Sequence, residues 1–336
     1  MELRRLGKSG VSVSPVCFGT MLFGNPTTEK EATNLIHQAI DQGVYFIDTA
    51  SSYEGYNRDV GSPGGVAEEY LGKILKGKRD KVVLLTKIAN ALGPGPHQKG
   101  GSRIHLQTEL ENCLRRLQTD CVDILMLHWP DLETPFEESL RTLDLFVKQG
   151  KIRYFGVSNF LAWEMCELLW LSDRFALEKM IAYEPPYSLL RREIEISELA
   201  FCRKFGIGIT PYQVLNGGWL SGKYRRGQAP SGSRLAENPG WMKTLPESIW
   251  EKIEIVNQLA TDLGVTLAEY SIAWSLRHAE VSSVILGIRN SAQLESSIKG
   301  SQVQIPQEHI EKIDKLFPLA MDLRWSAGPP QIRDWQ

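Results

Sequence analysis

Three apolar segments in the first half of the chain each end in a polar side chain that can take part in proton transfer. The segments are residues 44–47, 82–86 and 122–127, and they end in Asp48, Lys87 and His128, respectively. Tyr53 follows Asp48 after five residues, in a loop of small residues that can fold back over the end of its strand. A buried strand that ends in a carboxylate is costly unless the carboxylate has a partner. These four side chains are therefore candidates for one reactive site.

The four residue types fit the reduction of a carbonyl group. A tyrosine with an ordinary pKa of about 10 is a poor acid at neutral pH, and a nearby ammonium such as that of Lys87 lowers this pKa. Asp48 supplies the counter-charge that a buried lysine needs. His128 can donate a hydrogen bond to a carbonyl oxygen that gains negative charge. Each residue alone would more often be a turn former or a core side chain, and the combination is what favours catalysis.

Composition excludes several classes of protein. The chain has 336 residues, of which 42% are hydrophobic, so it can bury a large core. Its net charge of −2 gives no electrostatic reason to bind nucleic acid or an anionic membrane. No apolar run approaches the roughly 18 residues of a membrane helix, and the first five residues lack an apolar h-region, so we expect no secretory signal. The five cysteines include no CxxC pair and predict reduced thiols in a cytoplasmic protein. The histidine spacing predicts no metal site.

Apolar runs and helical patterns alternate along the whole chain. The expected strands are residues 16–19, 44–47, 82–86, 122–127, 152–159, 180–184, 207–210 and 281–286. The expected helices are residues 28–41, 64–76, 104–117, 136–147, 161–171, 194–205, 247–263, 267–277 and 291–298. Such alternation is typical of parallel sheets, and it gives eight strand-then-helix units.

We predict a single α/β domain over residues 1–336, a closed (β/α)₈ TIM barrel rather than an open doubly wound sheet. The glycine-rich stretch 93–98 lacks the third glycine of a dinucleotide-binding turn, which weakens the open-sheet alternative. The expected additions are an N-terminal hairpin at about 2–13, a long loop at 213–246 after the seventh strand, an extra C-terminal helix at 306–316 and a tail at about 318–336.

A closed barrel brings the carboxyl ends of its strands together on one face, where active sites of this fold lie. Seven residues fall at or just beyond such ends: Asp48, Lys87, His128, Asn159, Glu184, Tyr212 and Gly287. One polar strand end is ordinary, whereas this number indicates a site.

Short motifs along residues 3–298 resemble the aldo-keto reductase family, in particular the branch with bacterial sugar and inositol-linked reductases and potassium-channel β subunits. They include Phe18-Gly19-Thr20, Phe46-Ile47-Asp48-Thr49-Ala50, Thr86-Lys87, Leu127-His128, Gly156-Val157-Ser158-Asn159-Phe160, Leu220-Ser221-Gly222-Lys223-Tyr224 and Gly287-Ile288-Arg289-Asn290. Each motif is weak, but their order and spacing are specific. The family fold is the (β/α)₈ barrel, and its members reduce aldehydes or ketones with NADPH bound in an extended pose.

The resemblance implies roles for individual residues. Asp48, Tyr53, Lys87 and His128 match the family's catalytic tetrad. The residues implied for NADP(H) binding are Gly19, Thr20, Ser158, Asn159, Glu184, Tyr212, Gln213, Leu215, Gly217, Lys223, Ser233, Arg234, Gly287, Arg289, Gln293 and Ser297. Within this set, Ser158 and Asn159 would hold the carboxamide and Tyr212 would stack on the nicotinamide. Candidates for a substrate pocket are Met21, Phe23, Trp129 and Trp219, which could equally pack beneath loops.

Three positions depart from the family pattern. Glu184 stands where the family usually has Gln, Ser296-Ser297 stand where it has Glu-Asn, and Gln213-Val214 stand where it often has Ser-Pro. An ionised Glu184 beside the nicotinamide would favour the oxidised cofactor, since the oxidised ring is cationic. Alternatively, Glu184 is protonated or turned towards an arginine such as Arg191.

Three functions compete at this stage. The first is an NADPH-dependent oxidoreductase that interconverts an aldehyde or ketone, such as a sugar or polyol, and its alcohol. The second is a cofactor-bound, redox-sensing regulatory subunit that resembles the channel β subunits. The third is a barrel of unrelated chemistry with a Schiff base at Lys87, against which the loop and Gly287–Arg289 motifs argue. We expect a small-molecule partner, with no nucleic acid or membrane partner, and the sequence does not indicate the oligomeric state.

Overall fold

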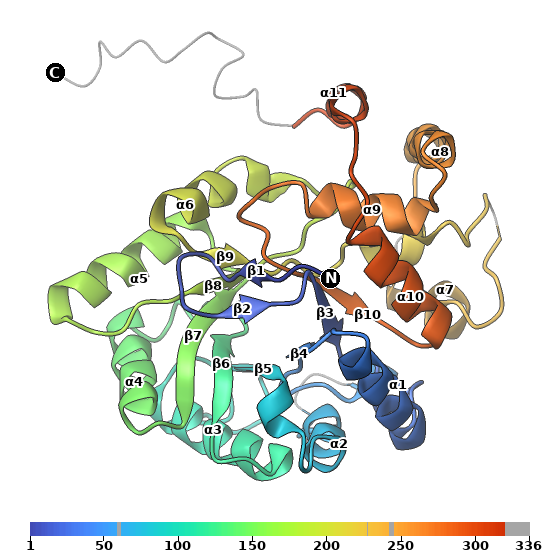
Figure 1. The fold of residues 1–336 in the computed structure, drawn as a ribbon. Helices are drawn as coiled ribbons and strands as arrows, with labels where there is room; N and C mark the ends of the chain where they lie inside the picture. Colours follow the sequence, from blue (N-terminus) through green and yellow to red (C-terminus); the bar gives the residue numbers. More distant parts are fainter. Residues whose placement is uncertain (59–61, 227, 242–244, 320–336) are drawn as a thin grey trace, which may run out of the picture.

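The computed structural model describes residues 1–58, 62–226, 228–241 and 245–319. Eight parallel strands form one curled sheet in the order β10-β3-β4-β5-β6-β7-β8-β9 (Figure 1). The strands are β3 (Val16–Gly19), β4 (Phe46–Asp48), β5 (Val83–Ile88), β6 (Val122–Leu127), β7 (Ile152–Ser158), β8 (Ala182–Glu184), β9 (Gly208–Ile209) and β10 (Val284–Gly287). The prediction of a (β/α)₈ fold is confirmed.

Backbone contacts between β9 and the residues before β10 close the sheet into a barrel. Ile209 pairs in parallel with Val281. The amide of Ile209 donates to the carbonyl of Glu280 at 2.7 Å, and the amide of Ser282 donates to the carbonyl of Ile209 at 2.9 Å. These contacts join the two edges of the eight-stranded sheet, so strands that are distant in sequence face one another across the interior.

Helices surround the barrel. They are α1 (Glu29–Asp41), α2 (Val66–Ile74), α3 (Arg103–Leu117), α4 (Phe136–Lys148), α5 (Ala162–Phe175), α6 (Glu198–Phe205), α7 (Arg234–Glu237), α8 (Glu247–Asp262), α9 (Leu267–Ser275), α10 (Ser291–Gly300) and α11 (Gln307–Leu316). Short 3₁₀ helices are η1 (Gly55–Asn57), η2 (Arg79–Lys81), η3 (Glu193–Glu195), η4 (Asn216–Ser221) and η5 (Pro239–Trp241). None of these helices is long and apolar enough to cross a membrane.

Helix α1 shows how local sequence sets these elements. Thr28 and Glu31 form a capping box that satisfies backbone amides at the start of the helix. Ala32, Leu35 and Ile36 then lie on one face of the helix and are buried in the main core. That face packs on the outside of the barrel, and the charged face remains in solvent.

The N-terminal hairpin consists of β1 (Arg4–Arg5) and β2 (Ser12–Val13), within the predicted range of 2–13. It crosses the middle of the barrel in Figure 1. Leu6 and Val13 from this hairpin are buried in the same apolar cluster as Phe46, Leu85 and other residues inside the barrel. The hairpin therefore closes the end of the barrel at which the strands begin.

Two expectations need correction in detail. The helix expected at 194–205 begins as η3 and becomes α-helical only from Glu198. The expected long loop at 213–246 contains η4, α7 and η5 in its described part, so it is not a structureless segment. The extra C-terminal helix is present as α11, whereas the predicted tail from about 318 lies almost entirely outside the described residues.

The seating of the hairpin gives a test of stability. Gly7 has φ of +58°, and a Cβ there would lie 2.2 Å from the carbonyl oxygen of Gly206. We expect Gly7→Ala to lower the free energy of unfolding by ~1–2 kcal/mol for the left-handed backbone and a further ~1–3 kcal/mol for the clash. Gly43→Ala is the matched control, since Gly43 has φ of +84° and nothing within 4 Å of the added Cβ. Equal losses in urea unfolding would contradict the close approach.

Candidate active site

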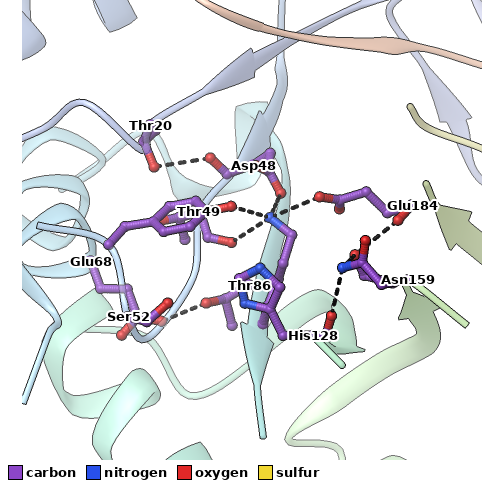
Figure 2. A network of polar contacts seen from close by, with 12 residues as sticks. Thr20, Asp48, Thr49, Ser52, Glu68, Thr86, His128, Asn159 and Glu184 are labelled. Carbon is purple, nitrogen blue, oxygen red and sulfur yellow. Dashed lines mark hydrogen bonds and ion pairs between the residues drawn. The ribbon is translucent and has the colours of Figure 1, made fainter. Parts of the chain in front are cut away.

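The ammonium of Lys87 is the centre of the site, and the side chain is 0% exposed. It forms an ion pair with Asp48 and a second one with Glu184, at 3.2 Å from Oε1. It also donates to the backbone carbonyl of Thr49 and to the hydroxyl of Tyr53, both at 3.1 Å. Figure 2 shows Asp48, Thr49 and Glu184 converging on this nitrogen. The predicted Asp–Lys–Tyr cluster is thus present, with a second carboxylate added to it.

Strand alternation places these groups. Successive side chains of a strand point to opposite faces, so residues two apart share a face. Phe46, Leu85 and Ala182 belong to the apolar cluster inside the barrel. Two residues later on the same strands stand Asp48, Lys87 and Glu184. The polar layer therefore lies directly above an apolar layer, at the end of the barrel where the strands finish.

The acidity of Tyr53 differs from the expectation. Burial raises the pKa of Tyr53 above its ordinary value, the charge of Lys87 lowers it, and the carboxylates of Asp48 and Glu184 raise it again. Lys87 acts in the expected direction, but burial and the two carboxylates outweigh it. Tyr53 is therefore a neutral phenol in this state: it carries a proton to donate, but the raised pKa makes it a weaker acid than the sequence predicted.

His128 is neutral and held by Asn90. Burial, then the charges of Lys87 and Arg58, lower the pKa of His128 well below its ordinary value. The side-chain nitrogen of Asn90 lies 2.6 Å from Nδ1 of His128 and 2.9 Å from Oγ of Ser52. An amide donor at Nδ1 leaves the proton of the neutral ring on Nε2. The rings of Tyr53 and His128 lie edge to face with centroids 5.9 Å apart.

Sequence reasoning missed Asn90. It stands three residues after Lys87, beyond the end of β5. The rule that polar residues at strand ends gather on one face could have included it. What the sequence did not show is that Asn90 reaches the histidine that follows the neighbouring strand.

Glu184 is 2% exposed, and its Oε2 atom is buried without a hydrogen-bond partner. Burial and the charge of Asp48 raise the pKa of Glu184 to about 8. The alternative that Glu184 turns towards Arg191 is not what the structure shows, since Arg191 bonds to Gln213 and approaches Glu193. Glu184 therefore faces the reactive centre.

The residues expected at the nicotinamide end lie beside Glu184. Oγ of Ser158 donates to the backbone carbonyl of Glu184 at 2.8 Å. Asn159, with φ of 65°, donates from Nδ2 to the backbone carbonyl of His128 at 2.9 Å, and its Oδ1 accepts from the hydroxyl of Tyr212 at 2.8 Å. Together with the unpartnered oxygen of Glu184, these groups can hold a planar amide.

The start of the loop after β9 turns through a series of left-handed residues. They are Gln213 (φ 57°), Asn216 (φ 45°), Gly217 (φ 70°) and Gly218 (φ 114°), and Leu215 lies among them. Turns of this kind direct backbone N–H groups towards a common point and can bind anions.

Three cations lie near one another beyond this turn. Burial, then the charges of Arg289 and Arg234, lower the pKa of Lys223. Arg289 donates to both carboxylate oxygens of Glu237, at 2.9 and 3.0 Å. Clustered like charges with one acidic partner fit a polyanion such as the phosphates of a dinucleotide. The residues present thus fit an NADP-type cofactor.

The other predicted cofactor residues border the same region. Gly19 on β3 pairs with Gly287 on β10, and the hydroxyl of Thr20 donates to the carbonyl of Asp48 at 2.9 Å. Ser233 caps α7. Oε1 of Gln293 accepts from the amide of Arg289 at 2.8 Å, and Oγ of Ser297 donates to the carbonyl of Gln293 at 2.7 Å.

The four candidate substrate residues differ in their surroundings. Trp129 is 51% exposed and stacks on His128 with an interplanar angle of 10°, so it lies beside the reactive ring. Met21 is half-buried after β3. Phe23 is buried against Phe18 and Tyr70. Trp219 is buried between Tyr224 and Trp250, as in the packing alternative. Among the described residues, no group of three His, Cys, Asp or Glu side chains could hold a metal.

Comparison with known proteins identifies the family of the chain. The profile of the aldo/keto reductase family matches residues 15–317. The chain is 34% identical over 330 residues to a probable voltage-gated potassium channel subunit beta of Arabidopsis thaliana, covering 96% of this chain and 95% of that protein. It is 32% identical over 325 residues to the uncharacterized oxidoreductase YrpG of Bacillus subtilis, with 95% and 96% covered. Protein tas of Escherichia coli is 28% identical over 340 residues, with 94% and 97% covered.

The barrel carries this cluster at its strand ends, and the family profile matches most of the chain. Together these findings define the protein as a member of a class of oxidoreductases. The chain belongs to the aldo/keto reductase family. The suspected branch is confirmed by the channel-subunit and oxidoreductase relatives.

The contact between Asn90 and His128 predicts the state of the imidazole. We expect ¹⁵N NMR to show His128 as the neutral Nε2–H form at about pH 5.5, where an ordinary histidine is mostly charged. Asn90→Asp places a carboxylate at Nδ1 and should raise the pKa of His128, while Asn90→Leu removes the contact without adding charge. Titration of His128 at an ordinary pKa in the unmodified protein would contradict this geometry.

Proposed function

We propose that this protein is an NADPH-dependent reductase of aldehydes or ketones, including sugar-like carbonyl compounds, that also works in reverse on the alcohols. The observation that carries the proposal is the buried contact of Lys87 with Asp48 and with the hydroxyl of Tyr53, beside a neutral His128. The reaction needs a proton donor and a hydrogen-bond donor at one carbonyl oxygen, and these residues supply both.

The chain's own groups orient the substrate and move one proton. Nε2–H of His128 donates to the carbonyl oxygen, and the phenol of Tyr53 gives its proton to that oxygen as charge develops. Lys87, at 3.1 Å, stabilises the phenolate that remains. When bound, NADPH supplies the hydride to the carbonyl carbon. In the reverse direction Tyr53 accepts the proton.

The residues that would hold the cofactor follow the site from one end to the other. Ser158, Asn159 and Tyr212 would hold the nicotinamide. The left-handed turn of 213–218 and Lys223 would hold the phosphates, and Arg289 would hold the 2′-phosphate. Because a guanidinium binds a phosphate with a fork of donors, we propose a preference for NADP(H) over NAD(H).

The first functional test removes the acid. Tyr53→Phe deletes the phenolic proton and keeps the ring, so turnover should fall about 10²–10⁴-fold while NADPH affinity stays nearly unchanged. Steady-state rates on a panel of aldehydes, ketones and sugars, with NADPH titration by fluorescence as the control, measure both. Native turnover in the Phe variant would refute the role of Tyr53. Lys87→Met should cause comparable loss, but it leaves Asp48 and Glu184 without a cation and needs a check of folding.

The second functional test concerns cofactor choice. Arg289→Ala should weaken NADPH binding by about 1.5–3 kcal/mol and leave NADH nearly unchanged, since only NADPH carries the 2′-phosphate. Glu237→Gln is the matched variant. It removes the acidic partner of Arg289, so it should tighten NADPH selectively. Equal effects on the two cofactors in dissociation constants would exclude Arg289 from the phosphate site.

A redox-sensing regulatory subunit is the second candidate. It is favoured by the 34% identity to the probable voltage-gated potassium channel subunit beta. The two candidates differ in turnover rather than in cofactor binding. Sustained multiple turnover with some carbonyl substrate supports the enzyme, and tight cofactor binding without such turnover supports the regulatory subunit.

A further inference from the structure

Glu184 and Asp48 share one buried cation. Both carboxylates contact the ammonium of Lys87, and all three side chains are buried. In the part of the chain that the structure describes, no second cation forms an ion pair with either carboxylate. The group therefore has a single positive charge and two acidic groups.

Charge balance decides how many of these acids are ionised. A buried anion without its own partner is costly, and of two carboxylates that share a site one keeps its proton to higher pH. Asp48 makes the closer contact with Lys87, whereas Glu184 is 3.2 Å away and has an oxygen without any donor. Glu184 is therefore the acid that keeps the proton, and Oε2 is the atom that carries it.

A neutral Glu184 resembles the glutamine usual at this position in the family. Its Oε1 atom accepts from Lys87, and a proton on Oε2 makes that oxygen a donor, as the amide nitrogen of glutamine would be. Unlike glutamine, Glu184 can lose this proton. Ser158 and Asn159, the residues expected to hold the nicotinamide, lie beside Glu184. Loss of the proton of Glu184 would therefore alter the binding of the nicotinamide end of the cofactor.

We propose that Glu184 couples proton release to the redox state of the cofactor: it stays a neutral acid beside the reduced nicotinamide and loses its proton when the oxidised nicotinamide binds. The O–H bond at Oε2 breaks, and the proton leaves to buffer. The physical reason is that the oxidised ring is cationic and favours a neighbouring anion, whereas the reduced ring is neutral. The inference rests on the proposed function, since it assumes that NADP(H) binds here.

The sign of the pH dependence follows from linkage. A ligand whose binding releases a proton binds more tightly as pH rises. In the cofactor-free protein, burial and the charge of Asp48 raise the pKa of Glu184 to about 8. NADP⁺ affinity relative to NADPH should therefore rise by up to about tenfold per pH unit between the lower pKa of Glu184 in the NADP⁺ complex and this value, and be level outside that window.

Other titratable groups face Glu184 from the neighbouring elements. They are Asp48, Tyr53, Lys87, Cys17 on β3 and Tyr212 after β9. Burial raises the pKa values of Cys17 and Tyr212 above their ordinary values, so both stay neutral in this range. Of the five groups, Tyr53 is the alternative source of a proton that the experiment tests, because the cationic ring would also stabilise its phenolate.

Calorimetry in two buffers of different ionisation enthalpy at about pH 7.5 counts the protons released on binding. The proteins are the unmodified chain, Glu184→Gln and Tyr53→Phe, each titrated with NADP⁺ and with NADPH. The NADPH titration is the reference, because both cofactors carry the 2′-phosphate and share any proton change there. The excess is the number of protons released with NADP⁺ minus the number released with NADPH. We expect the unmodified chain and Tyr53→Phe to release about half a proton or more in excess with NADP⁺, and Glu184→Gln to release no excess.

The outcomes separate this inference from the proposed function. An excess that persists in Glu184→Gln but disappears in Tyr53→Phe assigns the proton to Tyr53 and overturns the inference. Tight binding of both cofactors without any excess in the unmodified chain overturns the inference and leaves the reductase proposal standing. Failure of the unmodified chain to bind either cofactor overturns both.

Discussion

The buried ammonium of Lys87 is the constraint on which the site depends. A lysine at 0% exposure keeps its charge only if the surrounding groups replace its lost hydration. Asp48 does so from the neighbouring strand, Thr49 through its carbonyl, and Glu184 from a strand further around the barrel. The contacts of Lys87 with Asp48 and Glu184 thus join separate strands of the barrel, and its hydrogen bond to Tyr53 positions the phenolic hydroxyl. The contacts of Lys87 therefore both stabilise the fold and position the reactive groups.

The apolar layer beneath this cluster sets its electrostatics. Phe46, Leu85 and Ala182 fill the barrel, and the N-terminal hairpin closes the far end. Burial is the largest influence on the pKa values of Tyr53, His128 and Glu184. Burial keeps the phenol and the imidazole neutral, which are the forms that donate to a carbonyl oxygen. A wetter barrel with the same residues would not have this property.

Much of this arrangement could be predicted from the sequence. The eight strands, the hairpin and the gathering of Asp48, Lys87 and His128 follow from hydrophobic periodicity and from the rule that parallel strand ends meet on one face. The net rise in the pKa of Tyr53 could not be predicted, since it is a balance of burial against charges at specific distances. The role of Asn90 was missed for a similar reason, because it depends on a 2.6 Å contact between residues 38 apart in sequence.

The partner of Glu184 could not be determined from the sequence alone. The sequence by itself determined that an acid stands at the end of the sixth barrel strand, where relatives usually carry an amide, and that Arg191 or the cofactor could be its partner. Only the tertiary structure showed that its partner within the chain is Lys87 rather than Arg191, because the curled sheet brings that strand end to within 3.2 Å of the ammonium of Lys87. Alternation along a strand fixes which face a side chain occupies. The distance between groups on different strands, which governs their charge states, exists only once the chain has folded.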